Sequence, residues 1–214
     1  MARYDELKYR FTLLADEFPH LLTCEAIGSV DYHNKAYDTL RLELRERDGL
    51  DKVEVCLAFG THGNEDLSVE SMHEFLRSLL DLSYTHPLIT LPPPEERDQL
   101  RKALSLTIYF FNPIGLDRTE RSDGRRHDLN RWFGKDDPPQ EVKFVMDDMR
   151  GRHFDAGIDL HGDMTGKGFM IYEHTRLPVS IAADVIRVLE RNEVRIISDG
   201  NHEGDQAEGG VVAA

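Results

Sequence analysis

The fold is decided by residues 53–66, which read Val-Glu-Val-Cys-Leu-Ala-Phe-Gly-Thr-His-Gly-Asn-Glu-Asp. The first part is almost continuously apolar from Val55 to Phe59 and ends at Gly60. A short apolar run of this kind is typical of a strand in the interior of a sheet. Apolar residues at helical spacing follow between Leu67 and Leu79, so a helix is expected directly after the strand.

Strands and helices alternate along the rest of the chain. Apolar runs predict further strands at 104–111, 154–160, 168–172 and 194–197, of which the first two are expected in the interior of the sheet. Helical spacing predicts more helices at 4–14, 142–149 and 181–189. Between them, leucines alternate with charged residues over 40–44, which indicates a strand with one wet face near a sheet edge. We expect an α/β protein with an open, mostly parallel central sheet, mixed at its edges, and helices on both faces.

The composition excludes several classes of protein. The 214 residues carry a formal net charge of −14, which opposes binding to nucleic acid or to an anionic membrane surface. With 40% hydrophobic and 31% charged residues, the chain is neither disordered in bulk nor membrane-spanning. The acidic start lacks the apolar core of a signal peptide, and Cys24 and Cys56 are too few for a disulfide framework. A cytoplasmic protein is expected.

Polar residues and glycines follow each of the three predicted interior strands. They lie at 60–66, at 112–115 continuing to 131, and at 159–163. Open α/β sheets bind ligands at the carboxyl ends of their strands. We therefore expect these three segments to converge on one site.

Two of these segments contain residues that suit a metal ion. His62 and Glu65 are three apart at a loop-to-helix junction, and His161 follows another interior strand. Two histidines and a carboxylate are typical ligands of catalytic zinc, which lowers the pKa of bound water to about 7. Cobalt or nickel can occupy such a site in vitro. The alternative for each histidine is a hydrogen-bonded structural role.

The second segment is rich in arginine within an otherwise acidic chain. For Arg118, Arg125 and Arg126 we favour surface charges that balance nearby acids. Arg131 lies beside Asn130, and its guanidinium is suited to clamp a carboxylate.

These residues resemble the zinc carboxypeptidases of the carboxypeptidase A type and their relatives, the aspartoacylase and succinylglutamate desuccinylase deacylases. The segment 62–65, His-Gly-Asn-Glu, matches the first zinc motif, and Asp-Leu-His at 159–161 matches the third. Between them lie Asn-Pro-Ile-Gly at 112–115, Arg121, Asp-Leu-Asn-Arg at 128–131 and Phe133. The order and approximate spacing agree, and Ile114 departs from the aspartate usual in the family. The resemblance extends from the first helix to about Tyr172.

The resemblance implies a role for each matching residue. His62, Glu65 and His161 would hold one zinc ion, and Asn130 and Arg131 would hold the terminal carboxylate of the substrate. Arg121 would stabilise the oxyanion that forms as activated water attacks the carbonyl. We therefore expect a zinc carboxypeptidase-like catalytic domain over 1–200. The Gly- and acid-rich composition of 201–214 predicts a loop or frayed tail.

The general-base glutamate of the family has no match in this chain. Glu173, Glu203 and Glu208 are notable acids after the third motif, and each is expected to be a solvated carboxylate. The last residues begin like another strand, so we expect the domain to be incomplete at its C-terminus.

Three functions remain open at this stage. The first is a zinc-dependent carboxypeptidase that cleaves the C-terminal residue of a peptide. The second keeps the site but acts on a small N-acyl amino acid with a free carboxylate. The third is a zinc- and carboxylate-binding module without catalytic activity.

Overall fold

The computed structural model describes residues 2–46, 51–162, 172–174, 182–191 and 210–212. The chain divides into two compact units, residues 1–162 and 163–214. In the second unit β6 (Tyr172–His174) pairs antiparallel with β7 (Gly210–Val212), and α6 spans Ala182–Arg191, as predicted for that helix. The predicted strand at 194–197, most of that at 168–172 and the proposed boundary near residue 200 lie outside the described residues.

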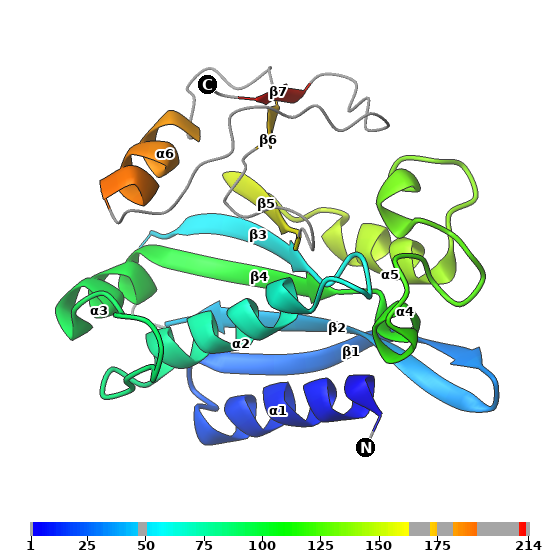
Figure 1. Cartoon of the computed structure of the whole chain (residues 1–214), viewed down its shortest axis with the longest axis horizontal. Coiled ribbons are helices and arrows are strands. Elements are labelled where there is room, and N and C mark those ends of the chain that lie inside the picture. The colour runs from blue at the N-terminus through cyan, green and yellow to red at the C-terminus, as the bar shows by residue number, and fades with distance from the viewer. Residues whose placement is uncertain (1, 47–50, 163–171, 175–181, 192–209, 213–214) are drawn as a thin grey trace. The chain divides into compact units, whose positions relative to one another are not determined.

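The first unit is built on an open five-stranded sheet (Figure 1). The strands in order across the sheet are β1 (Leu22–Tyr32), β2 (Lys35–Arg45), β4 (Leu104–Phe110), β3 (Val53–Phe59) and β5 (Ala156–Leu160). The pairs β4–β3 and β3–β5 are parallel, whereas β1–β2 and β2–β4 are antiparallel. The predicted α/β fold with a mixed open sheet is therefore confirmed.

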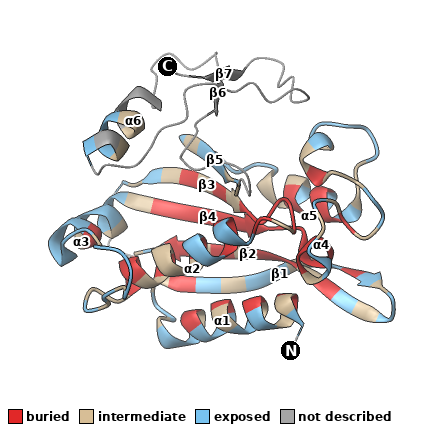
Figure 2. Ribbon diagram, viewed as in Figure 1, coloured by how far each residue is buried: buried red, intermediate tan, exposed pale blue. Residues whose placement is uncertain are grey.

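Helices cover both faces of this sheet because the central strand β4 is apolar on both sides. Leu106, Ile108 and Phe110 belong to one core cluster, which includes the apolar faces of α1 (Arg3–Glu17) and α2 (Asp66–Leu80). Tyr109 and Phe111 belong to a second cluster with α5 (Gln140–Met149). Figure 2 shows β4 buried along almost its whole length. The other described helices of the unit are α3 (Pro94–Ala103), α4 (Pro113–Arg118) and the 3₁₀ turn η1 (Leu129–Arg131).

The structure corrects the prediction that 154–160 forms an interior strand. Within the described sheet, β5 pairs with β3 alone and forms the edge, and Ile158 is 50% exposed. An apolar run indicates that a strand is hydrophobic, but it does not show whether the strand pairs with one neighbouring strand or with two. The alternating segment 40–44 lies in β2, next to the edge strand β1. The apolar periodicity of the sequence did not predict β1. The short charged helix α3 was also not predicted.

Both cysteines are free thiols and half-buried. Burial raises the pKa of Cys24 and of Cys56 to about 11, so both are protonated at neutral pH. None of the described helices has the length and apolarity needed to cross a membrane.

A buried arginine fastens α3 to the end of α2. Arg97 is 5% exposed, and its guanidinium donates to the backbone carbonyls of Ser78, Asp81, Leu82 and Pro92 at 2.7–3.2 Å. Two of these carbonyls lie at the C-terminal end of α2, where a positive charge also interacts favourably with the helix dipole. Arg97 therefore satisfies backbone groups that have no helical partner.

We predict that Arg97→Ala lowers the free energy of unfolding by about 2–4 kcal/mol, because it leaves buried carbonyls without a donor. Arg97→Lys should recover only part of the loss, since an ammonium group cannot span four carbonyls. Urea unfolding measures both. Lys102→Ala, in the same helix and half-exposed, is the control and should cost less than about 0.5 kcal/mol. An equal effect of Arg97→Ala and Lys102→Ala would contradict this role.

Asp117 of α4 ties three elements together. Its carboxylate accepts hydrogen bonds from Tyr4 N at 2.6 Å, Lys35 Nζ at 2.7 Å and Tyr37 Oη at 3.0 Å. Burial acts to raise the pKa of Asp117, but Lys35 and the other donors outweigh it and lower the pKa below its usual value. A carboxylate with a lowered pKa stabilises the fold above its unfolded-state pKa of about 3.9 and loses this effect on acidification.

Asp117→Asn should therefore destabilise the protein at neutral pH, and its deficit relative to wild type should shrink as pH falls below about 4. Unfolding free energies measured between pH 7 and pH 3 give this difference. Asp136→Asn, at an exposed position, should follow the wild-type curve. A deficit that does not change with pH would show that the charge of Asp117 is not what stabilises the fold.

Candidate metal centre

The register of the parallel strands brings three loops to one edge of the sheet. Phe59 at the end of β3 lies opposite Phe110 of β4 on one side and Leu160 of β5 on the other. The chain leaves all three strands at the same level, so the segments that begin at Gly60, Phe111 and His161 start side by side. The convergence expected from the sequence is confirmed (Figure 1).

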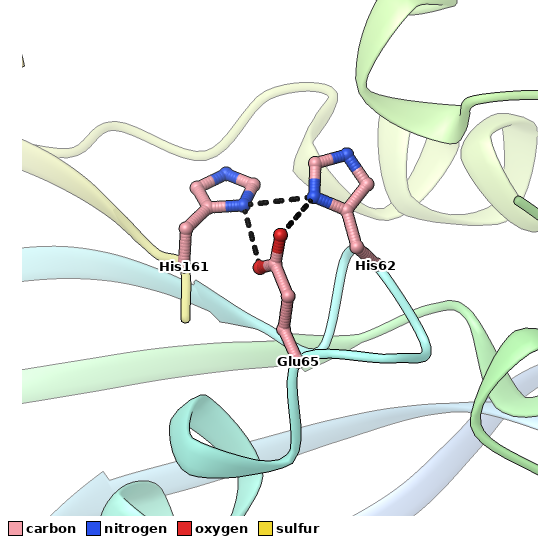
Figure 3. Close-up of side chains that lie close together, drawn as sticks. All are labelled: His62, Glu65 and His161. Atoms are coloured by element: carbon pink, nitrogen blue, oxygen red, sulfur yellow. Dashed lines mark hydrogen bonds and ion pairs between the residues drawn. The ribbon is translucent and has the colours of Figure 1, made fainter. Parts of the chain in front are cut away.

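His62, Glu65 and His161 meet at this edge, as Figure 3 shows. Glu65 lies just before α2, and its Oε1 is 2.6 Å from His62 Nδ1. Its Oε2 is 3.0 Å from His161 Nδ1 and also accepts from Gly162 N at 3.0 Å. The two Nδ1 atoms are 3.2 Å apart. Four nitrogen and oxygen atoms of the three side chains therefore surround one small volume.

Two aspartates hold the outer nitrogens of the histidines. His62 Nε2 is 3.1 Å from Asp128 Oδ1, and His161 Nε2 is 2.8 Å from Asp159 Oδ2. Asp159 also accepts from Thr61 Oγ1 at 3.0 Å, which links the end of β5 to the residue before His62. With both Nε2 atoms held in this way, each imidazole directs Nδ1 toward Glu65.

The charges within the cluster are strongly coupled. Burial acts to raise the pKa of Glu65, but hydrogen bonds from His161, His62 and Gly162 outweigh it and lower the pKa to about 2. Burial acts to lower the pKa of His161, but Asp159 and Glu65 outweigh it and raise the pKa to about 10. Without another cation, a proton on His161 balances the carboxylates. A cation at the centre of the cluster would take over this role.

The donor set fits a zinc ion. Two imidazole nitrogens and one carboxylate can supply ligand atoms that all lie within 4.8 Å of one another. His₂Glu is a ligand set found in catalytic zinc sites, and carboxylates on the outer imidazole nitrogens are the usual support for such ligands. His62 and Glu65 are buried, and His161 is more exposed, so the centre is accessible from one side.

Arg121 lies beside the cluster. Its Nη1 is 3.9 Å from Glu65 Oε1, and its Nε and Nη2 are both 3.1 Å from Asp128 Oδ2. The side chain is 47% exposed. The positively charged fork therefore faces both the candidate metal ligands and solvent.

The neighbouring arginines have different surroundings. Arg118 pairs with Glu120 at 2.8 Å, as expected for a surface charge. Asp123 accepts hydrogen bonds from the backbone N–H groups of Arg125 and His127 and from His127 Nδ1. Asp128 is paired with Arg121 and His62, and so belongs to the site.

Asn130 and Arg131 lie in η1, directly after Asp128 and Leu129. The Asp128–His62 contact places the start of this turn at the cluster of His62, Glu65 and His161. The buried side chain of Leu129 anchors the turn in the second core cluster. Arg131 is exposed and Asn130 half-buried. Contact with a substrate carboxylate is a prediction that awaits a bound ligand.

Sequence reasoning did not assign a role to Asp128 or Asp159. Both residues lie inside the quoted motifs, so the motifs already contained the information. Asp159 and His161 are two apart at the end of a strand, where side chains point to the same face. This spacing alone could have suggested an aspartate–histidine pair.

Comparisons with known proteins support the fold. Neither a protein-family model nor a curated protein matches the chain. Among solved structures, the metallo-carboxypeptidase from Burkholderia cenocepacia matches with a TM-score of 0.61 and 18% identity, covering 82% of this chain and 45% of that chain. The carboxypeptidase A from Helicoverpa armigera matches with a TM-score of 0.59 and 17% identity, covering 88% and 52%.

A third match is the metallo-carboxypeptidase from Pseudomonas aeruginosa in complex with (2-guanidinoethylmercapto)succinic acid. Its TM-score is 0.58 at 18% identity, covering 86% of this chain and 48% of that chain. This chain thus spans about half the length of these structures. The likeness establishes the fold of the metallo-carboxypeptidases for this protein, while a relationship to the deacylases stays a prediction.

We predict that Asp128→Asn and Asp159→Asn each weaken Zn²⁺ binding by about 10–100-fold, because each removes the carboxylate that orients a ligand histidine. Competition with a chromophoric chelator measures the affinity. Asp136→Asn, in an exposed part of the same loop region, is the matched control and should bind zinc as wild type does. Unchanged affinity in both site variants would show that the two aspartates do not support metal ligands.

Proposed function

We propose that this protein is a zinc-dependent metallocarboxypeptidase that hydrolyses the C-terminal peptide bond of its substrate. The observation that carries the proposal is the cluster of His62, Glu65 and His161, with Arg121 beside it, at the carboxyl ends of the strands in a metallo-carboxypeptidase fold. The motifs of this family occur in the same order along the sequence. Fold and local chemistry therefore favour the same class of enzyme.

His62, Glu65 and His161 would hold one zinc ion, which supplies an activated water and polarises the scissile carbonyl. The chain's own residues prepare this chemistry. Asp128 and Asp159 fix the imidazoles, and Gly162 N helps to fix Glu65, so that the ligand atoms are preorganised before a metal binds.

Arg121 is the group that we propose to stabilise the developing oxyanion. Its guanidinium is within 3.9 Å of Glu65 and half-exposed, so it can reach a carbonyl oxygen that lies next to the metal ligands. Asn130 and Arg131 are proposed to hold the free carboxylate of the substrate, with Arg131 as the bidentate donor. The two arginines would thus bind different oxygens of one substrate.

The general base is not assigned to a described residue. In residues 51–162, the further carboxylates hydrogen-bonded to the two histidines are those of Asp128 and Asp159, and both are engaged by Nε2 atoms. Glu173 lies in β6 of the second unit, paired with Val211, and Glu203 and Glu208 lie outside the described residues. Hydrolysis by this chain is therefore the critical test of catalysis as opposed to binding.

The first experiment measures zinc content and the turnover of blocked dipeptides and of acetyl and succinyl amino acids. We expect one zinc per chain, faster hydrolysis of the dipeptides, and loss of this activity on chelation. Preferential turnover of the acyl amino acids would favour a deacylase. Zinc binding without any turnover would favour a carboxylate-binding module.

Substitutions of the two arginines should affect different kinetic parameters. Arg131→Ala should chiefly raise KM, because it removes a contact to the substrate carboxylate, whereas Arg121→Ala should chiefly lower kcat, by about 100-fold or more. The surface variant Arg118→Ala is the control and should leave both unchanged. Activity that survives Arg131→Ala unaltered would contradict carboxylate recognition by this residue.

Ligand binding gives a measurement that does not depend on turnover. Trp132, the single tryptophan of the chain, directly follows Arg131 and packs edge-on against His127 at 5.4 Å between ring centroids. We expect (2-guanidinoethylmercapto)succinic acid, a dicarboxylate, to change the emission of Trp132 in the zinc-loaded protein and to inhibit hydrolysis. Arg131→Ala should weaken both effects.

A further inference from the structure

Asn112 joins three segments of the chain at the end of β4. Only 1% of the residue is exposed. Its Oδ1 accepts from Gly115 N at 2.9 Å, which caps α4. Its Nδ2 donates to the carbonyl oxygen of Thr61 at 2.8 Å and to that of Arg121 at 3.2 Å. One side-chain amide thus makes three hydrogen bonds in a buried place.

The two carbonyls that accept from Nδ2 belong to residues that carry or adjoin the proposed catalytic groups. Thr61 directly precedes His62, and Arg121 carries the guanidinium that lies 3.9 Å from Glu65. Both N–H bonds of the amide lie in one plane with a fixed angle between them. The backbone before the first metal-ligand candidate and the backbone of Arg121 are therefore held at a set separation by one group.

The packing around Asn112 leaves little room for these segments to move. A Cβ atom at Gly63 would lie 1.8 Å from the carbonyl carbon of Gly115, so the His62–Glu65 loop rests directly on the backbone of α4. A Cβ atom at Gly115 would lie 2.5 Å from Asn112 Oδ1. Only glycine permits these approaches. Water cannot easily replace Asn112 as the donor to the two carbonyls in so close a contact.

We infer that Asn112 is a positioning residue that sets where Arg121 lies relative to the His62–Glu65 loop. The side chain of Arg121 is half-exposed, and the described contacts that orient it are those with Asp128 and Glu65. The position of its backbone therefore matters for where the guanidinium lies. The kinetic consequence of this inference rests on the proposed function; the structural consequence does not.

The alternative is that Asn112 serves only as the cap of α4, and two substitutions separate the two roles. Asn112→Asp and Asn112→Ser keep an oxygen that can cap the helix. The aspartate carboxylate offers no donor, and the single hydroxyl of serine cannot replace the two N–H donors that reach Thr61 and Arg121. We expect both variants to lower kcat by about 10–100-fold with a smaller change in KM, because small misplacements of a reacting group have large kinetic effects. Zinc affinity should stay within about threefold of wild type. If Asn112 were only a cap, both variants would have wild-type kcat.

A double-mutant cycle with Arg121→Ala tests whether Asn112 acts through that arginine. In the Arg121→Ala background, Asn112→Ser should lower kcat by no more than about twofold. Lys102→Ala, far from the site in α3, should combine with Asn112→Ser additively. Full additivity between Asn112→Ser and Arg121→Ala would overturn the inference, because a general loss of stability would act independently of Arg121.

Amide hydrogen exchange tests the structural part in the absence of any turnover. Asn112→Ser and Asn112→Asp should each accelerate exchange over residues 118–128 by about tenfold, and should leave residues 142–149 in α5 unchanged. Unchanged exchange over 118–128 in both variants would overturn the inference whether or not the protein is an enzyme. If wild type hydrolyses nothing while the exchange responds as expected, the proposed activity fails and the positioning role stands.

Discussion

The matched register of three parallel strands is the constraint on which the rest of the first unit depends. Because Phe59 lies opposite both Phe110 and Leu160, the loops after β3, β4 and β5 start at one level. A slip of β5 by two residues would keep its side chains on the same faces but move His161 by about 7 Å along the strand. His161 Nδ1 could then no longer lie 3.0 Å from Glu65.

Charge is organised differently at the site than over the chain as a whole. The net charge is −14, yet the acids closest to the candidate metal centre are engaged by cationic or polar partners. Asp128 bonds to His62 and Arg121, and Asp159 bonds to His161 and Thr61. These two carboxylates would repel an acidic ligand if they were unpaired. At this site they instead orient the imidazoles of His62 and His161. The proposed attraction for a substrate carboxylate then depends on the arginines at the rim.

The surroundings of the site are built from backbone as much as from side chains. Gly63 allows the ligand loop to rest on α4, and Asn112 connects that loop to Arg121 through main-chain carbonyls. Elsewhere in the unit, Arg97 and Asp117 fix helices in a similar way, by donating to or accepting from backbone groups. Such contacts limit the movement of these loops, although their glycine-rich sequences would suggest flexible backbone.

The sequence by itself determined the strands β3 and β4, the main helices and the three metal-ligand candidates, because periodicity and motif order are local properties of the chain. Only the tertiary structure decided that β5 forms the edge of the described sheet, that Asp128 and Asp159 hold the histidines, and that Asn112 links Thr61 to Arg121. The physical reason is that several of these contacts join residues 50 to 100 positions apart in the sequence, and their geometry follows from strand register and loop packing, which no local pattern encodes.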